Sequence, residues 1–260
     1  MKTCWFGLLC VATGCTTLGP MPTTMGVSAM PAARPEVSVT GHALPGYYLS
    51  SSVLADGKGT AMLGGSVLVE PDRYVELPGF IVGARAYGDK NDVGFEPLLG
   101  YRRKIGPDAP LAYGAVVAFT QASGKARGAQ YEATRVSAEA MAAYRVFQSA
   151  RSVDVALTAA VNATALSAEA AYCVDAQGYG HDCGDMEMTI AGKASGVYVA
   201  ATAGVALGVG QRWRSTFHGM RVAFTGTGGT MPTLVNGVQQ SARGFFALGI
   251  NLGWHFGSKK

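Results

Sequence analysis

The sequence has 260 residues and a net charge of +4, yet only 15% of its residues are charged, against about 25% in ordinary soluble domains. Hydrophobic residues make up 48% and glycine occupies 36 positions, which excludes disorder because disordered chains are poor in apolar residues. No run approaches the ~20 apolar residues of a transmembrane helix. The basic residues are scattered, which gives nucleic-acid binding no support. A glycine-rich β protein remains, either a soluble sandwich or a membrane barrel.

The N-terminus has the form of an export signal. Lys2 precedes an apolar stretch at 4–12, which is too short to span a bilayer. The following Ala12-Thr13-Gly14-Cys15 resembles the bacterial lipobox, in which small residues precede a cysteine that becomes lipidated and N-terminal. The resemblance implies a signal peptide over 1–14 and lipidation at Cys15. Because Thr16 rather than Asp follows, it also implies delivery to the outer membrane. An ordinary secretory signal with an incidental cysteine is the alternative.

The cysteine count agrees with export. Cleavage before Cys15 removes two of the five cysteines, Cys4 and Cys10, and the lipid occupies a third. Cys173 and Cys183 remain as an even pair in an oxidising compartment, where we expect a disulfide rather than two free thiols.

Residues 15–44 are predicted to be a lipidated N-terminus followed by a flexible tether. Prolines recur there among Thr, Met, Ala and Gly, and only Arg34 and Glu36 are charged.

The body of the chain, 45–257, is predicted to be all-β and to form one antiparallel transmembrane β-barrel. In 241–256 apolar residues occupy every second position from Ala242 to Phe256, which is long for a soluble strand. One face is apolar and the other small or polar, whereas a soluble sandwich would carry many charges on its second face. We expect about ten strands, or eight if the first begins at residue 77. The ten are 46–54, 61–70, 77–88, 94–104, 111–122, 131–147, 152–166, 193–209, 214–228 and 241–256.

Loop lengths orient this barrel. Residues 148–151 and 210–213 are predicted to be short turns, and 167–192 and 229–240 long loops. Outer-membrane barrels have short periplasmic turns and longer external loops. An even number of strands then places both ends of the chain, including the lipidated N-terminus, on the periplasmic side.

The C-terminal segment 249–256 alternates apolar residues and finishes with the aromatic Phe256. It resembles the last strand of bacterial outer-membrane β-barrel proteins, although a tail at 258–260 follows. The resemblance implies location in the bacterial outer membrane, contact with its lipids and recognition by the barrel-assembly machinery. We expect a monomer.

Charged residues on the inward-facing positions are expected to pair with one another and to plug the lumen. Buried charges need partners, and eight to ten strands leave room for side chains and little else. A small anion-preferring pore is the alternative. The residues are Arg85, Glu96, Arg102, Arg135, Glu139, Arg145, Asp154, Arg221 and Arg243.

The segment 167–192 contains five acidic residues and no Lys or Arg. We expect a solvated surface loop rather than a Ca²⁺ site, and we predict no metal or cofactor. The acidic residues are Glu169, Asp175, Asp182, Asp185 and Glu187.

We therefore predict an integral outer-membrane barrel of structural or surface-interaction type that is not an enzyme. Three alternatives stay open: a small pore, a surface hydrolase that uses His181, and a soluble β-sandwich lipoprotein that binds a ligand. The hydrolase has no Gly-x-Ser-x-Gly or His-Glu-x-x-His motif to support it.

Overall fold

The computed structural model describes residues 15–17, 37–47, 60–69, 79–88, 92–104, 110–126, 129–149, 153–174, 188–213, 216–235 and 238–256. No helix in these ranges is long and apolar enough to cross a membrane. The strands are β1 (Cys15–Thr17), β2 (Val37–Tyr47), β3 (Thr60–Val69), β4 (Phe80–Gly88), β5 (Asp92–Lys104), β6 (Leu111–Ala126), β7 (Ala129–Gln148), β8 (Val153–Val174), β9 (Met188–Trp213), β10 (Thr216–Val235) and β11 (Val238–Phe256).

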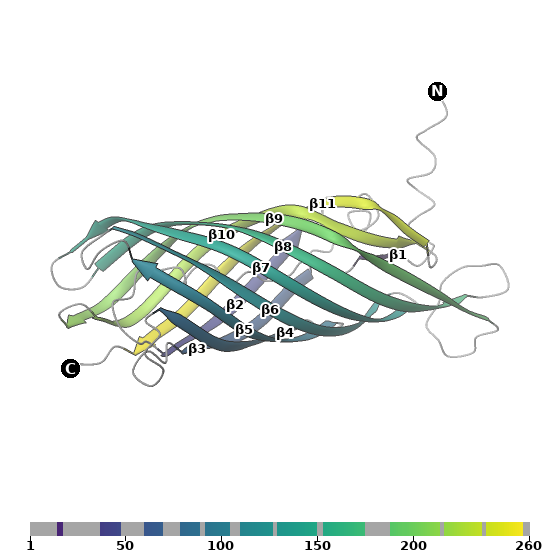
Figure 1. The fold of residues 1–260 in the computed structure, drawn as a ribbon, viewed down its shortest axis with the longest axis horizontal. Coiled ribbons are helices and arrows are strands. Elements are labelled where there is room, and N and C mark those ends of the chain that lie inside the picture. The colour runs from purple at the N-terminus through teal and green to yellow at the C-terminus, as the bar shows by residue number, and fades with distance from the viewer. Residues whose placement is uncertain are drawn as a thin grey trace, which may run out of the picture.

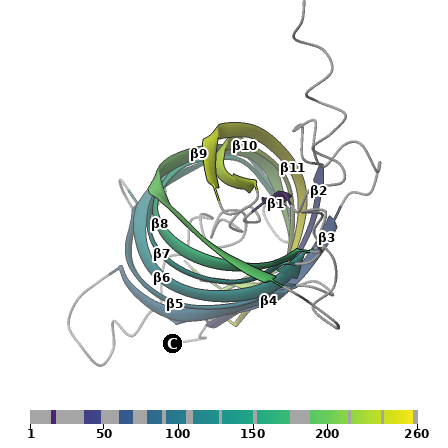
Figure 2. The ribbon, with the colours of Figure 1, turned by 90° about the vertical axis from the view of Figure 1, so that its right-hand side faces the viewer.

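Ten of these strands, β2 to β11, form one closed antiparallel ring. Each strand pairs with its neighbours in the sequence, and β11 closes the ring by pairing with β2. Figure 1 shows the strands inclined to the long axis, and Figure 2 looks along the ring. The predicted all-β antiparallel barrel is confirmed, and the pairings favour ten strands over eight.

The barrel has two unlike ends. At one, which we call the C-terminal rim, β11 ends at Phe256 and β10 begins at Thr216. At the other, the far rim, β8 ends at Val174 and β10 ends at Val235. A strand needs about 9–11 residues to cross a bilayer at ~45°, whereas β9 has 26. The wall around β8 and β9 therefore extends well beyond a bilayer, and Figure 1 shows it reaching farthest on the right.

The first strand of the ring lies earlier than predicted. The sequence placed it at 46–54 after a tether ending at 44, but β2 covers 37–47. Pro45 suggested a break, because proline has no N–H to donate to a ladder. The structure accommodates it locally: the pairing of β2 with β11 passes from Ala43–Ile250 to Gly46–Ala247 and omits Pro45. The start of the predicted tether is also paired, as β1.

Two predicted long loops are largely strand. Most of 229–240 belongs to β10 and β11, which are joined by residues 236–237 alone, and 167–174 and 188–192 belong to β8 and β9. The prediction was wrong because the alternation of apolar with polar residues stops there. That alternation reports contact with lipid, whereas backbone pairing continues where the outer face becomes polar.

In the described residues of β5 to β11, the outer face of the barrel carries a belt of exposed apolar side chains. Along β8 the outward Leu157 and Val161 are 50% and 59% exposed, whereas the inward Ala156 and Ala160 are 0% and 6% exposed. Large apolar side chains are likewise exposed on β5, β6, β7, β9, β10 and β11. A water-soluble domain would bury such residues, so this surface is suited to lipid.

Aromatic and polar residues mark the two edges of the belt. Near the C-terminal rim, four exposed aromatic residues lie within four positions of their strand ends and form a girdle of the kind found at membrane interfaces. Toward the far rim, two rows of polar residues in register follow the belt on β6 to β9. The girdle is Tyr101, Tyr113, Tyr144 and Trp254; the rows are Gln121, Thr134, Ser167 and Ser195, then Ser123, Glu132, Glu169 and Lys193.

The belt predicts that one substitution will act differently at two outward positions of β8. Val161→Arg places a charge in the hydrocarbon layer and is expected to lower the free energy of unfolding by about 2–4 kcal/mol. Ser167→Arg, on the same strand and face but in the polar row, is expected to cost about 0–1 kcal/mol. Urea unfolding of protein folded into phospholipid vesicles measures both. Equal effects of the two substitutions would contradict the placement of the belt.

Candidate functional site

The inward face of the barrel holds most of the charges that the sequence placed there. Seven of the nine residues are at most 8% exposed: Arg85, Glu96, Arg102, Arg135, Glu139, Asp154 and Arg221. Arg145 is half-buried beside an irregularity of the register between Arg145 and Phe147. Arg243 lies on β11 opposite Met231, and its side chain is outside the described part of the structure.

A buried ion pair joins β4 to β5. Arg85 and Glu96 are register partners, and their side chains are 2% and 0% exposed. The Nε and Nη2 atoms of Arg85 both donate to Oε2 of Glu96, the former at 2.6 Å. On the next strand, Thr120 Oγ1 donates to Oε1 of Glu96 at 2.8 Å. The carboxylate is thus satisfied on both oxygens, as a charge without access to water requires.

The same cluster continues around the wall to β9. Arg135 is the register partner of Thr120. Tyr198 is the register partner of Thr164, and the charged groups nearest its phenol are those of Arg135 and Glu96. We call these residues the polar layer; its members come one each from β4 to β9. They are Arg85, Glu96, Thr120, Arg135, Thr164 and Tyr198.

A second buried ion pair lies near the C-terminal rim. Arg221 Nη2 of β10 is 3.8 Å from Asp154 Oδ2 of β8, and the two side chains are 0% and 5% exposed. These strands are separated by β9, on which Gly208 is the register partner of both residues. Because glycine has no side chain, the pair meets across β9 without obstruction.

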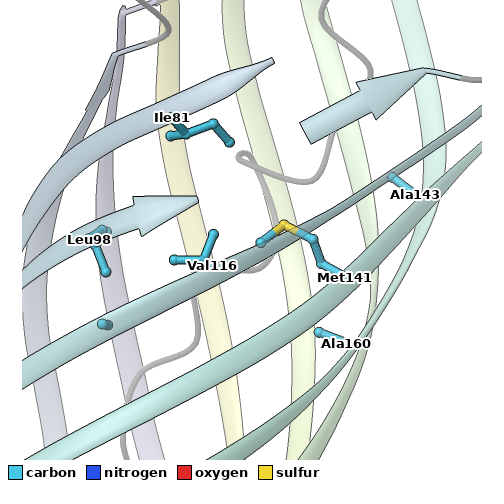
Figure 3. Packing of buried hydrophobic residues seen from close by; sticks show 7 residues of the cluster. Ile81, Leu98, Val116, Met141, Ala143 and Ala160 are labelled. Atoms are coloured by element: carbon cyan, nitrogen blue, oxygen red, sulfur yellow. The ribbon is translucent and has the colours of Figure 1, made fainter. Parts of the chain in front are cut away.

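An apolar cluster lies on the inward face of β4 to β8 between these two charged levels, with the buried Glu139 in register with its member Val116. On each of β4 to β8 its member lies nearer the C-terminal rim than the polar layer does; Ile81, for example, precedes Arg85 on β4. Figure 3 shows these side chains directed into the barrel from several strands. We call them the apolar plug: Ile81, Leu98, Val116, Ala118, Met141, Ala143 and Ala160.

The inward face therefore combines paired charges with apolar side chains, although Arg85 Nη1 and Thr158 Oγ1 are buried without a hydrogen-bond partner. The apolar plug lies on the C-terminal-rim side of the polar layer. Among the described residues, no three or more His, Cys, Asp or Glu are grouped so that they could hold a metal ion.

The other predicted site residues lie either on strands of the structure or outside the described residues. Cys15 lies on β1 in register with Val235, at the far rim; the expectation that it lies at the same end as the C-terminus is wrong in this structure, because β1 pairs with the far end of β10. Glu169 is exposed on β8, where Lys193 Nζ lies 2.5 Å from its Oε1. Cys173 is on β8 in register with Thr189. Outside the described residues lie 1–14, 258–260, Cys183, His181, Asp175, Asp182, Asp185 and Glu187.

The sequence did not single out the uncharged members of the polar layer. Thr120, Thr164 and Tyr198 lie on inward positions of long strands, where parity could have placed them. Nothing in the sequence indicates which charged group each of them meets, since that depends on the register between strands.

No family model and no curated protein matches the chain. Among solved structures it is similar to the outer membrane protease OmpT from Escherichia coli, at a TM-score of 0.45 and 11% identity over 85% of this chain and 95% of that one. It is also similar to Neisserial surface protein A, at a TM-score of 0.34 and 12% identity over 85% and 97%. The translocator domain of autotransporter NalP from Neisseria meningitidis gives a TM-score of 0.38 and 11% identity over 88% and 91%.

These similarities are too low to carry an activity from any neighbour. All three neighbours are bacterial outer-membrane β-barrel proteins, the class predicted for this chain. The closed ring, the apolar belt and the girdle are themselves the features of that class. Together the ring, the belt and the girdle make the chain a membrane-spanning β-barrel.

The ion pair of the polar layer predicts a strong asymmetry between substitutions. Glu96→Ala leaves the Arg85 charge buried and is expected to cost about 3–5 kcal/mol of unfolding free energy. Thr120→Val removes a single hydrogen bond to the same carboxylate and should cost about 1–3 kcal/mol. The double variant Arg85→Met with Glu96→Met should recover much of the loss, since no charge is left without a partner. Urea unfolding measures all three. A double variant no better than Glu96→Ala would contradict the pairing.

Proposed function

We propose that the protein is a structural, surface-interacting barrel of the outer membrane whose lumen is plugged by its own side chains. The observation that carries this proposal is the burial of the inward charges, because Glu96 and Arg221 are both 0% exposed. In a water-filled channel, charges that line the wall are hydrated.

The arrangement of the lumen supports a plug rather than an anion-preferring pore. An anion path needs basic groups in contact with water along its length. Here Arg85 is engaged by Glu96 and Arg221 lies 3.8 Å from Asp154, one pair on each side of the apolar plug. An ion entering the lumen would have to displace paired charges and pass the apolar side chains on β4 to β8.

The wall beyond the belt supports a role at the surface. The outward residues of β6 to β9 change there from apolar to polar, while the strands remain paired. Lys193 and Glu169 form an ion pair on this wall with side chains 79% and 69% exposed. A rigid polar sheet that stands above the lipid offers a surface for contact with other molecules of the cell exterior.

Planar-bilayer recording of the refolded protein tests the plug. The unmodified barrel is expected to show no sustained conductance. Met141→Ala combined with Arg221→Ala shortens one side chain of the apolar plug and one of the rim pair, and it should open a measurable current. Arg103→Ala combined with Leu157→Ala shortens two outward residues and serves as the matched control.

A folded band that shifts on boiling establishes that each variant has formed a barrel before recording. Steady conductance of the unmodified protein would overturn the plugged lumen and favour the small pore.

A further inference from the structure

Two neighbouring strands of the ring separate toward the far rim. The pairing of β9 with β10 runs from Trp213–Thr216 to Ala200–Gly229 and stops there. Beyond that point, β9 continues to Met188 with β8 alone as its partner in the described structure, and β10 continues to Val235 alongside β11. We call the two separated edges, residues 188–199 of β9 and 230–235 of β10, the seam.

The place of the separation has local causes. The last pair, Ala200–Gly229, places a glycine where a Cβ atom would lie 2.5 Å from the carbonyl oxygen of Val199, as at other paired glycines of the barrel. Just beyond it, the register of β10 with β11 shifts between Met231 and Thr233. An irregularity of this kind bends a strand and increases its twist. The pairing of β9 with β10 therefore ends close to an irregularity of β10.

The β10 edge of the seam already holds a strand. Cys15, Thr16 and Thr17 of β1 pair antiparallel with Val235, Leu234 and Thr233. Figure 2 shows β1 inside the outline of the ring at this end of the barrel. An exposed edge offers a row of N–H and C=O groups, and an added strand is the element that satisfies them.

The β9 edge is capped by a side chain that imitates a strand. Gln239 Nε2 donates to the carbonyl oxygen of Ser195 at 2.8 Å, and Ser195 N–H donates to Oε1 of Gln239 at 3.0 Å. The two residues thus exchange both bonds, as hydrogen-bonded partners on antiparallel strands do. One edge of the seam is therefore met by a strand and the other, at Ser195, by the Gln239 side chain.

We propose that the seam is an acceptor for an extended strand and that its occupant is the protein's own segment Cys15–Thr17. This strand closes the β10 edge and holds the N-terminal part of the mature chain at the far rim. A lipid anchor on Cys15 in the leaflet next to the C-terminal rim is incompatible with this position. The proposal does not depend on whether the lumen conducts.

A single substitution tests the register of the proposed strand. Antiparallel partners have Cα atoms about 4.5–5.5 Å apart, which lies within the range that a disulfide bridges. Val235→Cys is therefore expected to form a disulfide with the native Cys15 on mild oxidation. The disulfide appears as a mobility shift on non-reducing gels that reductant abolishes, and peptide mass spectrometry identifies the linked residues. Leu234→Cys is the matched control, because Leu234 is in register with Thr16 rather than with Cys15 and successive positions of a strand alternate between the two faces, so it should not cross-link.

Each other outcome overturns the proposal. A folded Val235→Cys barrel without the cross-link, with Cys15 acylated by mass spectrometry, shows a lipid anchor instead. A cross-linked dimer shows that the seam takes the strand of a second copy. Should Val235→Cys fail to fold, Thr17→Cys with Thr233→Cys in a Cys15→Ser background probes the same pairing, and its absence from a folded barrel is equally decisive.

Discussion

The constraint on which the structure depends is that a backbone in lipid must satisfy its own hydrogen bonds. Closing the sheet by pairing β11 with β2 gives every strand of the ring two partners over most of its length. The seam is the exception. Pairing of β9 with β10 stops at Ala200, where Val199 and Val197 are still 53% and 75% exposed, and the outer face of β9 changes to polar at Ser195, a few residues farther along. Once the wall leaves the lipid, an open edge is tolerable, and short segments and side chains suffice to cap it.

Closure also fixes the character of the lumen. A ring of ten strands has an interior only slightly wider than its side chains. Large inward groups then need small neighbours: Gly208 gives Arg221 and Asp154 room to meet across a strand, and Gly204 lies where a Cβ would be 2.5 Å from the carbonyl oxygen of Phe224. The abundance of glycine is thus a requirement of packing inside a narrow ring.

The sequence predicted the faces of the strands much better than their ends or partners. Parity alone placed Glu96 and Arg221 inward, because lipid on the outside imposes a strict alternation. The ends of the strands could not be predicted from this alternation, because at 167–174 the outer face is polar while the backbone pairing persists. The contact between Arg85 and Glu96 could not be predicted from the sequence either, because it depends on the register between strands, which is set by the whole ring. β2 was missed for a different reason: Pro45 was interpreted as a break, whereas the structure keeps it in register with Ala61 of β3 and leaves it out of the pairing with β11 alone.

The position of Cys15 follows from counting strands. Ten strands return the chain to the rim at which the ring begins, so β2 starts and β11 ends at the same rim. This parity led the sequence argument to place Cys15 there too. The structure adds an eleventh paired segment, β1, outside the ring's own count, and its antiparallel pairing with the last residues of β10 puts Cys15 at the opposite rim. A lipobox cysteine and a seam strand make opposite demands on the same residue, because an anchor needs it in a leaflet and pairing needs it at the sheet edge. The state of the Cys15 side chain therefore decides on which side of the membrane the N-terminal segment is held.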